Sequence, residues 1–132
     1  MKILDTTYYT VKRSSAGLGL FACKEIKKGD RIIEYIGKML TAAQANEKGG
    51  QYLFEISTRR TIDGTTRKNT ARYINHSCAP NTESEVEGSQ VFIDAIKKIL
   101  PGEEITYDYG KEFWKTYIKP KGCRCVRCKN KN

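Results

Sequence analysis

The sequence has no long apolar run and no N-terminal leader pattern. None of its hydrophobic stretches approaches the roughly 20 residues that cross a bilayer, and its first residues lack the basic, apolar and small-residue order of a secretory signal. Internal repeats and low-complexity linkers are also missing. We therefore expect a soluble, intracellular protein with no membrane partner, folded in a reducing compartment. At 132 residues the chain can bury roughly two-thirds of its unfolded surface, which suits one compact core.

Negative charge is scarce, above all near the C-terminus. The chain carries 24 Lys and Arg against 15 Asp and Glu, a net charge of +9. From Lys115 onward there are seven Lys or Arg residues and no Asp or Glu. Such a run is usually a solvated surface, and the alternative is attraction to a nucleic acid or to an acidic protein surface. The charge alone does not identify a partner, and a weak contact between the basic tail and a nucleic acid remains an alternative.

The chain is expected to be mostly β, built from short strands. Apolar stretches bounded by Gly, Pro or Asn predict strands at residues 18–22, 31–36, 52–56, 91–96 and 104–108. Turns are expected at Glu87-Gly88 and at Pro101-Gly102. A compact β-rich domain with little helix follows.

One helix is predicted over residues 41–48. This segment is rich in Ala and Gln, begins with the Thr41 and Gln44 of a capping box, and stops at two glycines. We expect it to connect strands and to lie beside the site without a catalytic role.

A Gly-x-Gly segment lies at residues 17–19. Glycine permits positive φ and a close backbone approach, so an ordinary turn accounts for the pattern. It is not a dinucleotide-binding fingerprint, because the third Gly is missing and no long helix pattern follows. A backbone cradle for another cofactor remains open.

The most informative stretch is residues 72–81, Arg-Tyr-Ile-Asn-His-Ser-Cys-Ala-Pro-Asn, which holds the only His of the chain. Amide, imidazole, hydroxyl and thiol groups followed by Pro are poor helix or strand interiors and predict a structured loop. Further along, residues 103–109 read Glu-Glu-Ile-Thr-Tyr-Asp-Tyr. The alternation places Ile105, Tyr107 and Tyr109 on one face of a strand, and its two tyrosines suit an aromatic pocket with polar tips.

Six segments, in this order, resemble those of the SET-domain protein lysine methyltransferases. They are Gly-Leu-Gly-Leu-Phe at 17–21, Glu-Tyr-Ile-Gly at 34–37, Tyr-Leu-Phe at 52–54, Ile-Asp-Gly-Thr at 62–65, the loop at 69–81 and the strand at 102–109. The resemblance covers residues 8–128, over nine-tenths of the chain. It implies a SET-domain fold of small curled sheets and one or two short helices, whose C-terminal segment threads beneath the Asn-His-Ser-Cys loop as a pseudoknot. It also implies a catalytic SET domain at residues 1–113 and a zinc-binding basic tail, or post-SET segment, at residues 114–132.

The resemblance implies methyl transfer from S-adenosylmethionine to a lysine side chain of a protein. The cofactor-binding positions of the family fall on Ala16, Gly17, Leu18, Gly19, Tyr52, Asn75 and His76. By this correspondence the backbone at residues 16–19 holds the methionine part of the cofactor and Tyr52 flanks it, while Asn75 and His76 bind its amino group and adenine. Two other interpretations of His76 remain, a catalytic base and a metal ligand.

The reaction-centre tyrosine of the family falls on Tyr109, and Tyr107 and Tyr35 are expected to line the lysine channel. In-line displacement at the sulfonium methyl mainly requires that an uncharged amine be aligned. Desolvation in an aromatic channel and the adjacent sulfonium both favour that neutral amine. In the enzymes that this chain resembles, the residue two before the reaction-centre tyrosine is Tyr or Phe, and the choice limits how many methyl groups are added. Tyr107 therefore implies a mainly monomethylating enzyme. The alternative for each tyrosine is ordinary core packing.

Cys123, Cys125 and Cys128 place three thiols within six positions, one short of the tetrahedral sulfur site that Zn²⁺ favours. The resemblance implies that Cys78 is the fourth ligand, although relatives usually leave four residues between the second and third tail cysteines and this chain leaves two. Disulfides are the alternative, which a cytosolic setting opposes. Cys23 is left over and is expected to be a small buried hydrophobic residue.

The chain departs from many relatives at Lys68, where Gly is common, and at Leu18, where Arg or Trp is common. These changes bear on cofactor affinity and leave the expected fold intact. The alternative function is a noncatalytic zinc-containing binding module that keeps the motifs as scaffold. For an enzyme, the expected substrate is a histone or another basic protein associated with nucleic acid, and the expected location is cytoplasmic or chromatin-associated.

Overall fold

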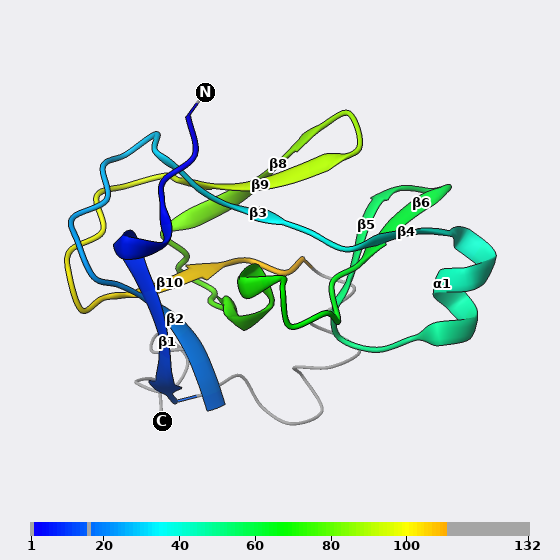
Figure 1. Cartoon of the computed structure of the whole chain (residues 1–132), viewed down its shortest axis with the longest axis horizontal. Coiled ribbons are helices and arrows are strands. Elements are labelled where there is room, and N and C mark those ends of the chain that lie inside the picture. Colours follow the sequence, from blue (N-terminus) through cyan, green and yellow to red (C-terminus); the bar gives the residue numbers. More distant parts are fainter. Residues whose placement is uncertain (1, 16, 111–132) are drawn as a thin grey trace.

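The computed structural model describes residues 2–15 and 17–110, and the strands in this part form three small sheets (Figure 1). The first has the order β1-β2-β10-β7, the second β3-β9-β8 and the third β4-β6-β5. The strands are β1 (Tyr9–Ser14), β2 (Gly17–Ala22), β3 (Arg31–Tyr35), β4 (Lys38–Thr41), β5 (Leu53–Ser57), β6 (Arg60–Asp63), β7 (Asn75–His76), β8 (Thr82–Glu87), β9 (Gln90–Ala95) and β10 (Glu104–Tyr107). The expected mostly β architecture is confirmed.

The one α-helix of residues 2–15 and 17–110, α1 (Ala42–Lys48), begins where the capping box predicts. Thr41 accepts a hydrogen bond from the backbone N–H of Gln44, and the Gln44 side chain accepts one from the backbone N–H of Thr41. The helix projects at one end of the molecule (Figure 1). Two short 3₁₀ helices, η1 (Thr6–Tyr8) and η2 (Thr70–Tyr73), complete the helical content of the described residues. None of these helices is long and apolar enough to cross a membrane.

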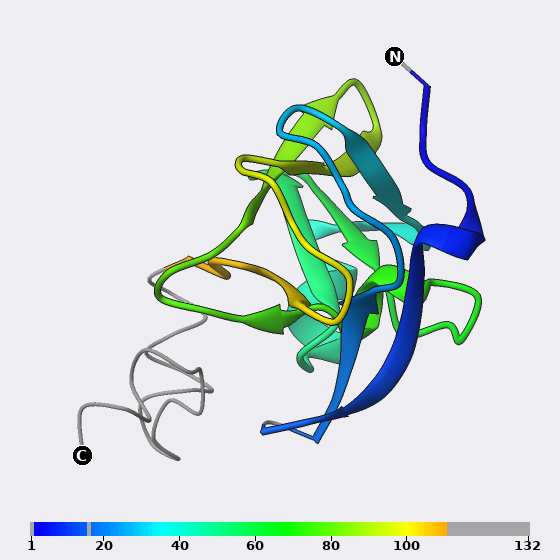
Figure 2. The same ribbon diagram turned by 90° about the vertical axis from the view of Figure 1, so that its left-hand side faces the viewer.

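The five predicted strands are all present, shifted by a residue or so at their ends, and the two predicted turns lie between elements. Gly88 has φ 63° in the tight connection between β8 and β9, and Gly102 has φ 91° in the turn before β10. Both values lie in the left-handed region that glycine adopts without strain. The β8–β9 and β1–β2 hairpins stand at opposite ends of the molecule in Figure 2.

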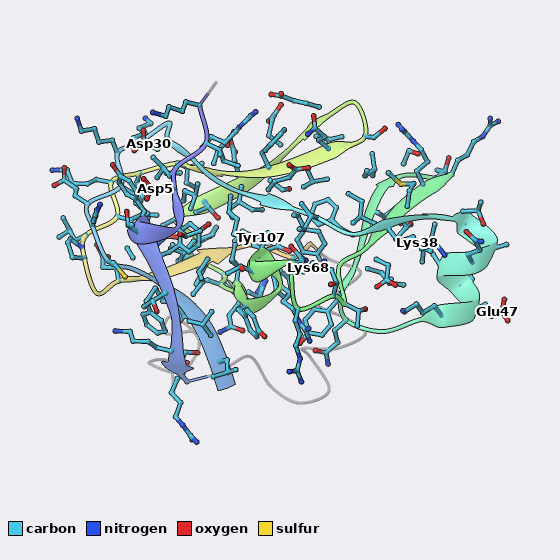
Figure 3. All side chains as sticks on the ribbon, in the orientation of Figure 1. Asp5, Asp30, Lys38, Glu47, Lys68 and Tyr107 are labelled. Carbon is cyan, nitrogen blue, oxygen red and sulfur yellow. The ribbon has the colours of Figure 1, made fainter. Side chains whose placement is uncertain are left out.

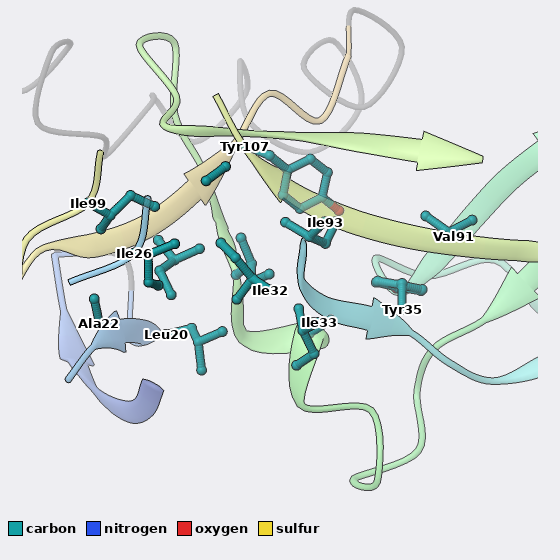
Figure 4. Close-up of a cluster of buried hydrophobic side chains, with 14 of the residues drawn as sticks. Leu20, Ala22, Ile26, Ile32, Ile33, Tyr35, Val91, Ile93, Ile99 and Tyr107 are labelled. Atoms are coloured by element: carbon teal, nitrogen blue, oxygen red, sulfur yellow. The ribbon is translucent and has the colours of Figure 1, made fainter. Parts of the chain in front are cut away.

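The core is aliphatic and draws on all three sheets. Leu20, Ile26, Ile32, Ile93 and Ile105 are fully buried, and Tyr35 and Tyr107 belong to the same cluster (Figure 4). The two tyrosines therefore join the hydrophobic core to the site described below.

Strand β10 lies in the middle of the first sheet although it comes last in the described chain. It pairs antiparallel with β2 and parallel with β7, so the C-terminal segment lies directly against the Asn-His-Ser-Cys loop. Asn81 clamps its far edge: the amide Nδ2 donates to the carbonyl of Glu104 at 2.8 Å, and Oδ1 accepts from the N–H of Thr106 at 2.9 Å. The Asn81 side chain thus makes the backbone hydrogen bonds that a neighbouring strand would otherwise make.

Cys23 is exposed, so the expectation that it is buried is wrong. The buried Ala22 ends β2, and the alternation of side chains along a strand turns the next residue outward.

Candidate functional site

Tyrosine side chains from different parts of the chain converge on one cleft of about 520 Å³. Tyr35 comes from β3, Tyr107 from β10, and Tyr52 and Tyr109 from the segments next to β5 and β10. The rings of Tyr107 and Tyr109 lie 4.7 Å apart, and Tyr35 lies 5.3 Å from Phe54. Tyr107 lies near the centre of the molecule (Figure 3). The cleft, which we call the tyrosine cleft, is lined by Tyr35, Asn46, Gly50, Gln51, Tyr52, Leu53, Phe54, Glu55, Ala71, Arg72, Ile74, Tyr107 and Tyr109.

Two hydroxyl groups of this cleft are held by hydrogen bonds, and burial favours the protonated form of three of its tyrosines. Tyr35 donates to the carbonyl of Tyr52 at 2.8 Å, and Tyr109 donates to the carbonyl of Ile74. Burial raises the pKa of Tyr35, Tyr107 and Tyr109 above the usual value near 10. At neutral pH the cleft therefore presents neutral hydroxyls on rigid aromatic rings.

Two residues that no site prediction included support this wall. Arg72 stacks its guanidinium over the Tyr52 ring at 4.4 Å. Asn69 is fully buried, accepts from the N–H of Ile36 at 3.1 Å and donates to the carbonyl of Gly64 at 3.1 Å. Both lie in the loop at residues 69–81. No local pattern in the sequence distinguishes an Arg or Asn that supports a cleft wall from one on the surface.

A second hollow, of about 390 Å³, lies at the β1–β2 hairpin and is lined by Arg13, Ser14, Gly17 and Leu18. Gly17 has φ 103°, a conformation that suits glycine. The Leu18 side chain is 52% exposed, whereas its carbonyl faces inward and accepts a hydrogen bond from Asn75 at 2.9 Å. Of the predicted cofactor residues of this hairpin, Gly17 and Leu18 border the hollow and Gly19 does not.

Asn75 links this hairpin to β10. Its Nδ2 donates toward Ser14 Oγ at 3.1 Å, the Leu18 carbonyl at 2.9 Å and Glu104 Oε2 at 2.8 Å. A side chain at Gly19 would clash with the Glu104 carboxylate and crowd the Asn75 amide, which explains the glycine there. The bonds given among the described residues use the Nδ2 atom of Asn75 and leave its Oδ1 atom able to accept another hydrogen bond.

The His76 side chain holds Tyr109 in place. Its Nδ1 accepts from the backbone N–H of Tyr109 at 3.1 Å, and its Nε2 lies 3.5 Å from the thiol of Cys78. Burial lowers the pKa of His76, although Asp108 opposes this. The ring is therefore a neutral connector between the loop and the segment after β10.

Several predicted residues lie outside the described part of the chain. These are Ala16, the three tail cysteines Cys123, Cys125 and Cys128, and the boundary between residues 113 and 114. Within the described residues no group of three or more His, Cys, Asp or Glu side chains is placed to hold a metal, and Cys78 is the one predicted zinc ligand that is described. It is half-buried beside His76.

Comparison with known proteins identifies relatives of this arrangement. The family model described as SET domain matches residues 17–110. The chain is 38% identical over 117 residues to Histone-lysine N-methyltransferase 2D of Homo sapiens, covering 80% of this chain and 2% of that protein. It is 43% identical over 105 residues to Histone-lysine N-methyltransferase, H3 lysine-4 specific, of Schizosaccharomyces pombe, covering 70% of this chain and 11% of that protein. The chain thus spans only a small part of these relatives.

A solved structure described as ctPRC2 in an autoinhibited conformation bound to S-adenosylmethionine is similar, with a TM-score of 0.70 and 28% identity. The match covers 77% of this chain and 15% of the chain in that structure. The crystal structure of the Chaetomium thermophilum polycomb repressive complex 2 gives a TM-score of 0.73 at the same identity, over 80% of this chain and 15% of that one.

Proposed function

Because the chain belongs to the SET domain family, we propose that it is a protein-lysine N-methyltransferase that uses S-adenosylmethionine. The observation that carries this function is the tyrosine cleft, in which the buried Tyr35 and Tyr107 and the half-buried Tyr109, all protonated, surround a space that an aliphatic side chain with a polar end would fill. The relatives named as histone-lysine N-methyltransferases support the reaction type.

The hollow at the β1–β2 hairpin fits the cofactor. The Asn75 Oδ1 acceptor suits an ammonium group, and Gly17 and the backbone of Leu18 allow close approach of a ligand. We assign the methionine part to this hairpin and to Asn75, with Ala16, Tyr52 and His76 as further contacts. When bound, S-adenosylmethionine supplies the electrophilic methyl group. A similar structure described as bound to S-adenosylmethionine supports this assignment.

In this reaction the chain mainly aligns the lysine amine with the methyl group that is transferred. Tyr109 is anchored by its hydroxyl to the Ile74 carbonyl and by its N–H to His76, so its ring is held at the junction of the cleft and the loop. Tyr35 and Tyr107 close the walls and exclude water. Positioning an amine in line with the bond that breaks supplies a large part of the rate, and no strong base is required.

We propose that the enzyme adds mainly one methyl group. The Tyr107 hydroxyl is buried inside the cleft wall, where it can hold the amine or a water beside it. A methylated amine has to break that bond or displace the water before it turns into line again. This opposes a second transfer.

We also propose one structural Zn²⁺ held by Cys78, Cys123, Cys125 and Cys128. Cys78 leaves the loop beside His76, whose Nε2–H points a donor toward the sulfur, as second-shell donors to zinc thiolates do. Such a site would fix the tail next to the cofactor hollow.

The substrate we propose is a histone or another basic protein associated with nucleic acid, and the proposed location is cytoplasmic or chromatin-associated. The named relatives support a histone. A basic tail on the enzyme would repel a basic peptide unless nucleic acid lies between them, so we include a weak contact with nucleic acid.

Transfer of labelled methyl groups tests the function. The full chain, incubated with labelled S-adenosylmethionine and a histone mixture or a peptide array, should label lysine residues, whereas Tyr109→Phe should label them at least tenfold more slowly. Absence of transfer to histones, basic proteins and arrayed peptides alike, with the cofactor bound, would favour the noncatalytic binding module.

A further inference from the structure

Strand β8 forms an open edge of the second sheet, at one end of the molecule (Figure 2). It pairs with β9 along its whole length without a bulge, and no described strand pairs with its other side. Every second residue of such a strand points its backbone N–H and C=O away from the sheet. Residues 83–87 are exposed, so an added strand can reach these groups.

The side of the second sheet opposite the buried Ile33 and Ile93 is acidic. Residues that pair directly across neighbouring strands lie on the same side of a sheet. The residues of this side are Arg31 and Glu34 on β3, Gln90, Phe92 and Asp94 on β9, and Glu83, Glu85 and Glu87 on β8. This side, which we call the acidic face, holds five carboxylates and one cation, although the whole chain has a net charge of +9.

Arg31 binds two of these carboxylates. Its Nε donates to Asp94 at 2.9 Å and its Nη2 donates to Glu87 at 2.9 Å. No ion pair between described residues includes Glu83 or Glu85. The outer strand therefore presents two exposed carboxylates, at alternate positions, that can pair with cations of a partner.

The sign of these charges restricts the partner. A second copy added through its own β8 would bring glutamates beside glutamates, and like charges directly opposite each other are destabilising. Nucleic acid is repelled for the same reason. An extended segment with Lys or Arg at alternate positions would pair its cations with Glu83 and Glu85 and its backbone with the open edge. A basic protein, the substrate class proposed above, can supply such a segment.

We propose that β8 docks a basic, extended segment of the substrate protein, separate from the segment that enters the tyrosine cleft. This role rests on the proposed methyl transfer. The docking strand is attached to the strand that carries Tyr107, because the Thr82 hydroxyl donates to the carbonyl of Thr106 in β10 at 2.7 Å. A second contact raises the local concentration of the target lysine at the cleft, and the acidic face offsets repulsion of a basic substrate by the basic tail.

A peptide without lysine tests the docking strand apart from the cleft. The probe is a fluorescent peptide of alternating Thr and Arg, slightly longer than β8. In anisotropy titrations, Glu83→Gln combined with Glu85→Gln should raise its Kd by about fivefold. The control, Glu25→Gln combined with Glu47→Gln, removes the same charge from exposed positions outside β8 and should change Kd by less than about twofold. Equal effects of the two double variants would overturn the proposal.

A modified probe separates strand addition from attraction by charge alone. The twin peptide is methylated at every backbone nitrogen, so it keeps all its Arg side chains and cannot donate backbone hydrogen bonds. The wild type should bind this twin about fivefold more weakly or worse, since main-chain bonds supply affinity in strand addition. Equal binding of both peptides would exclude pairing with the edge of β8. This comparison needs no variant, so it holds even if a double variant does not fold.

The contribution to methyl transfer is measured with a long peptide that joins the lysine sequence found by the array to the Thr-Arg segment through flexible linkers of several lengths. In the wild type the segment should lower KM by about fivefold and leave kcat unchanged. The Gln double variant should lose this advantage and should methylate the short peptide as the wild type does. Equal KM values for the long and short peptides would show that β8 does not serve the substrate. Tight binding of the lysine-free probe without any methyl transfer would instead refute the proposed function.

Discussion

The carboxamide of Asn75 lies 2.8 Å from the carboxylate of Glu104, so the two signature segments of the sequence are joined by a direct hydrogen bond. The same carboxamide reaches the carbonyl of Leu18 in the hairpin. Three segments that are distant in the chain therefore meet at one side chain. Loss of that side chain should affect the hollow more than the overall fold.

Asn75→Ala should weaken S-adenosylmethionine binding by about tenfold or more, because it removes the Oδ1 acceptor and releases Glu104 and Leu18. Isothermal calorimetry measures the change. The control is Glu104→Gln, which keeps an acceptor oxygen for Asn75 and should cost less. Unchanged affinity in Asn75→Ala would show that the hairpin is not the cofactor site.

Tyr107→Phe should shift the products toward di- and trimethyl-lysine, because Phe keeps the buried ring and removes the hydroxyl that restricts the amine. Mass spectrometry of a reaction run to completion gives the methyl count. Tyr109→Phe serves for comparison and should mostly abolish turnover. Trimethyl-lysine as the main wild-type product would refute control by the hydroxyl.

The purified protein should contain one zinc ion per chain, and chelation should weaken cofactor binding, since metal binding and folding of such a site are coupled. Cys125→Ser should lose the metal. Cys23→Ser is the matched control, because Cys23 is exposed and should leave the zinc content unchanged. Elemental analysis without zinc, or full activity of Cys125→Ser, would contradict the site.

Asn69→Ala should lower the free energy of unfolding by roughly 1 to 3 kcal/mol, because it leaves the buried carbonyl of Gly64 and the partly buried N–H of Ile36 without their partner. Urea denaturation measures this change. Asn46→Ala on the exposed face of α1 is the control and should differ from the wild type by about 0.5 kcal/mol or less. A similarly small effect at Asn69 would mean that water replaces its bonds.

Local patterns were enough to predict the elements that carry strong signals. The capping box at Thr41 and Gln44 places the helix start correctly, and the alternation of Ile105 and Tyr107 matches the buried face of β10. Strands β1, β4, β6, β7 and β8 were not predicted. β8, with the sequence Thr-Glu-Ser-Glu-Val-Glu, is almost wholly exposed, so it has no apolar face to reveal it.

The sequence indicated which residues line the two hollows, but it did not indicate the contacts between them. The signature segments pointed to Tyr35, Tyr107, Tyr109 and Asn75, all of which lie in or beside the two hollows. The roles of Glu104, Asn69 and Arg72 depend on partners from distant segments, and single-sequence patterns contain no information on such pairs. The same limit applied to Cys23, whose exposure follows from where β2 ends.

The central place of β10 bears on the order of folding. Ile105 pairs with Leu20 across most of the described chain, and Thr106 pairs with Asn75, so the first sheet closes only after long loops have formed. Contacts of such sequence separation are slow to form because loop closure costs entropy before they stabilise anything. The hairpins β1–β2 and β8–β9 need no such closure and should form early. The tyrosine cleft, which needs β10, should therefore appear in the last kinetic step, and partly folded chains should not bind a peptide there.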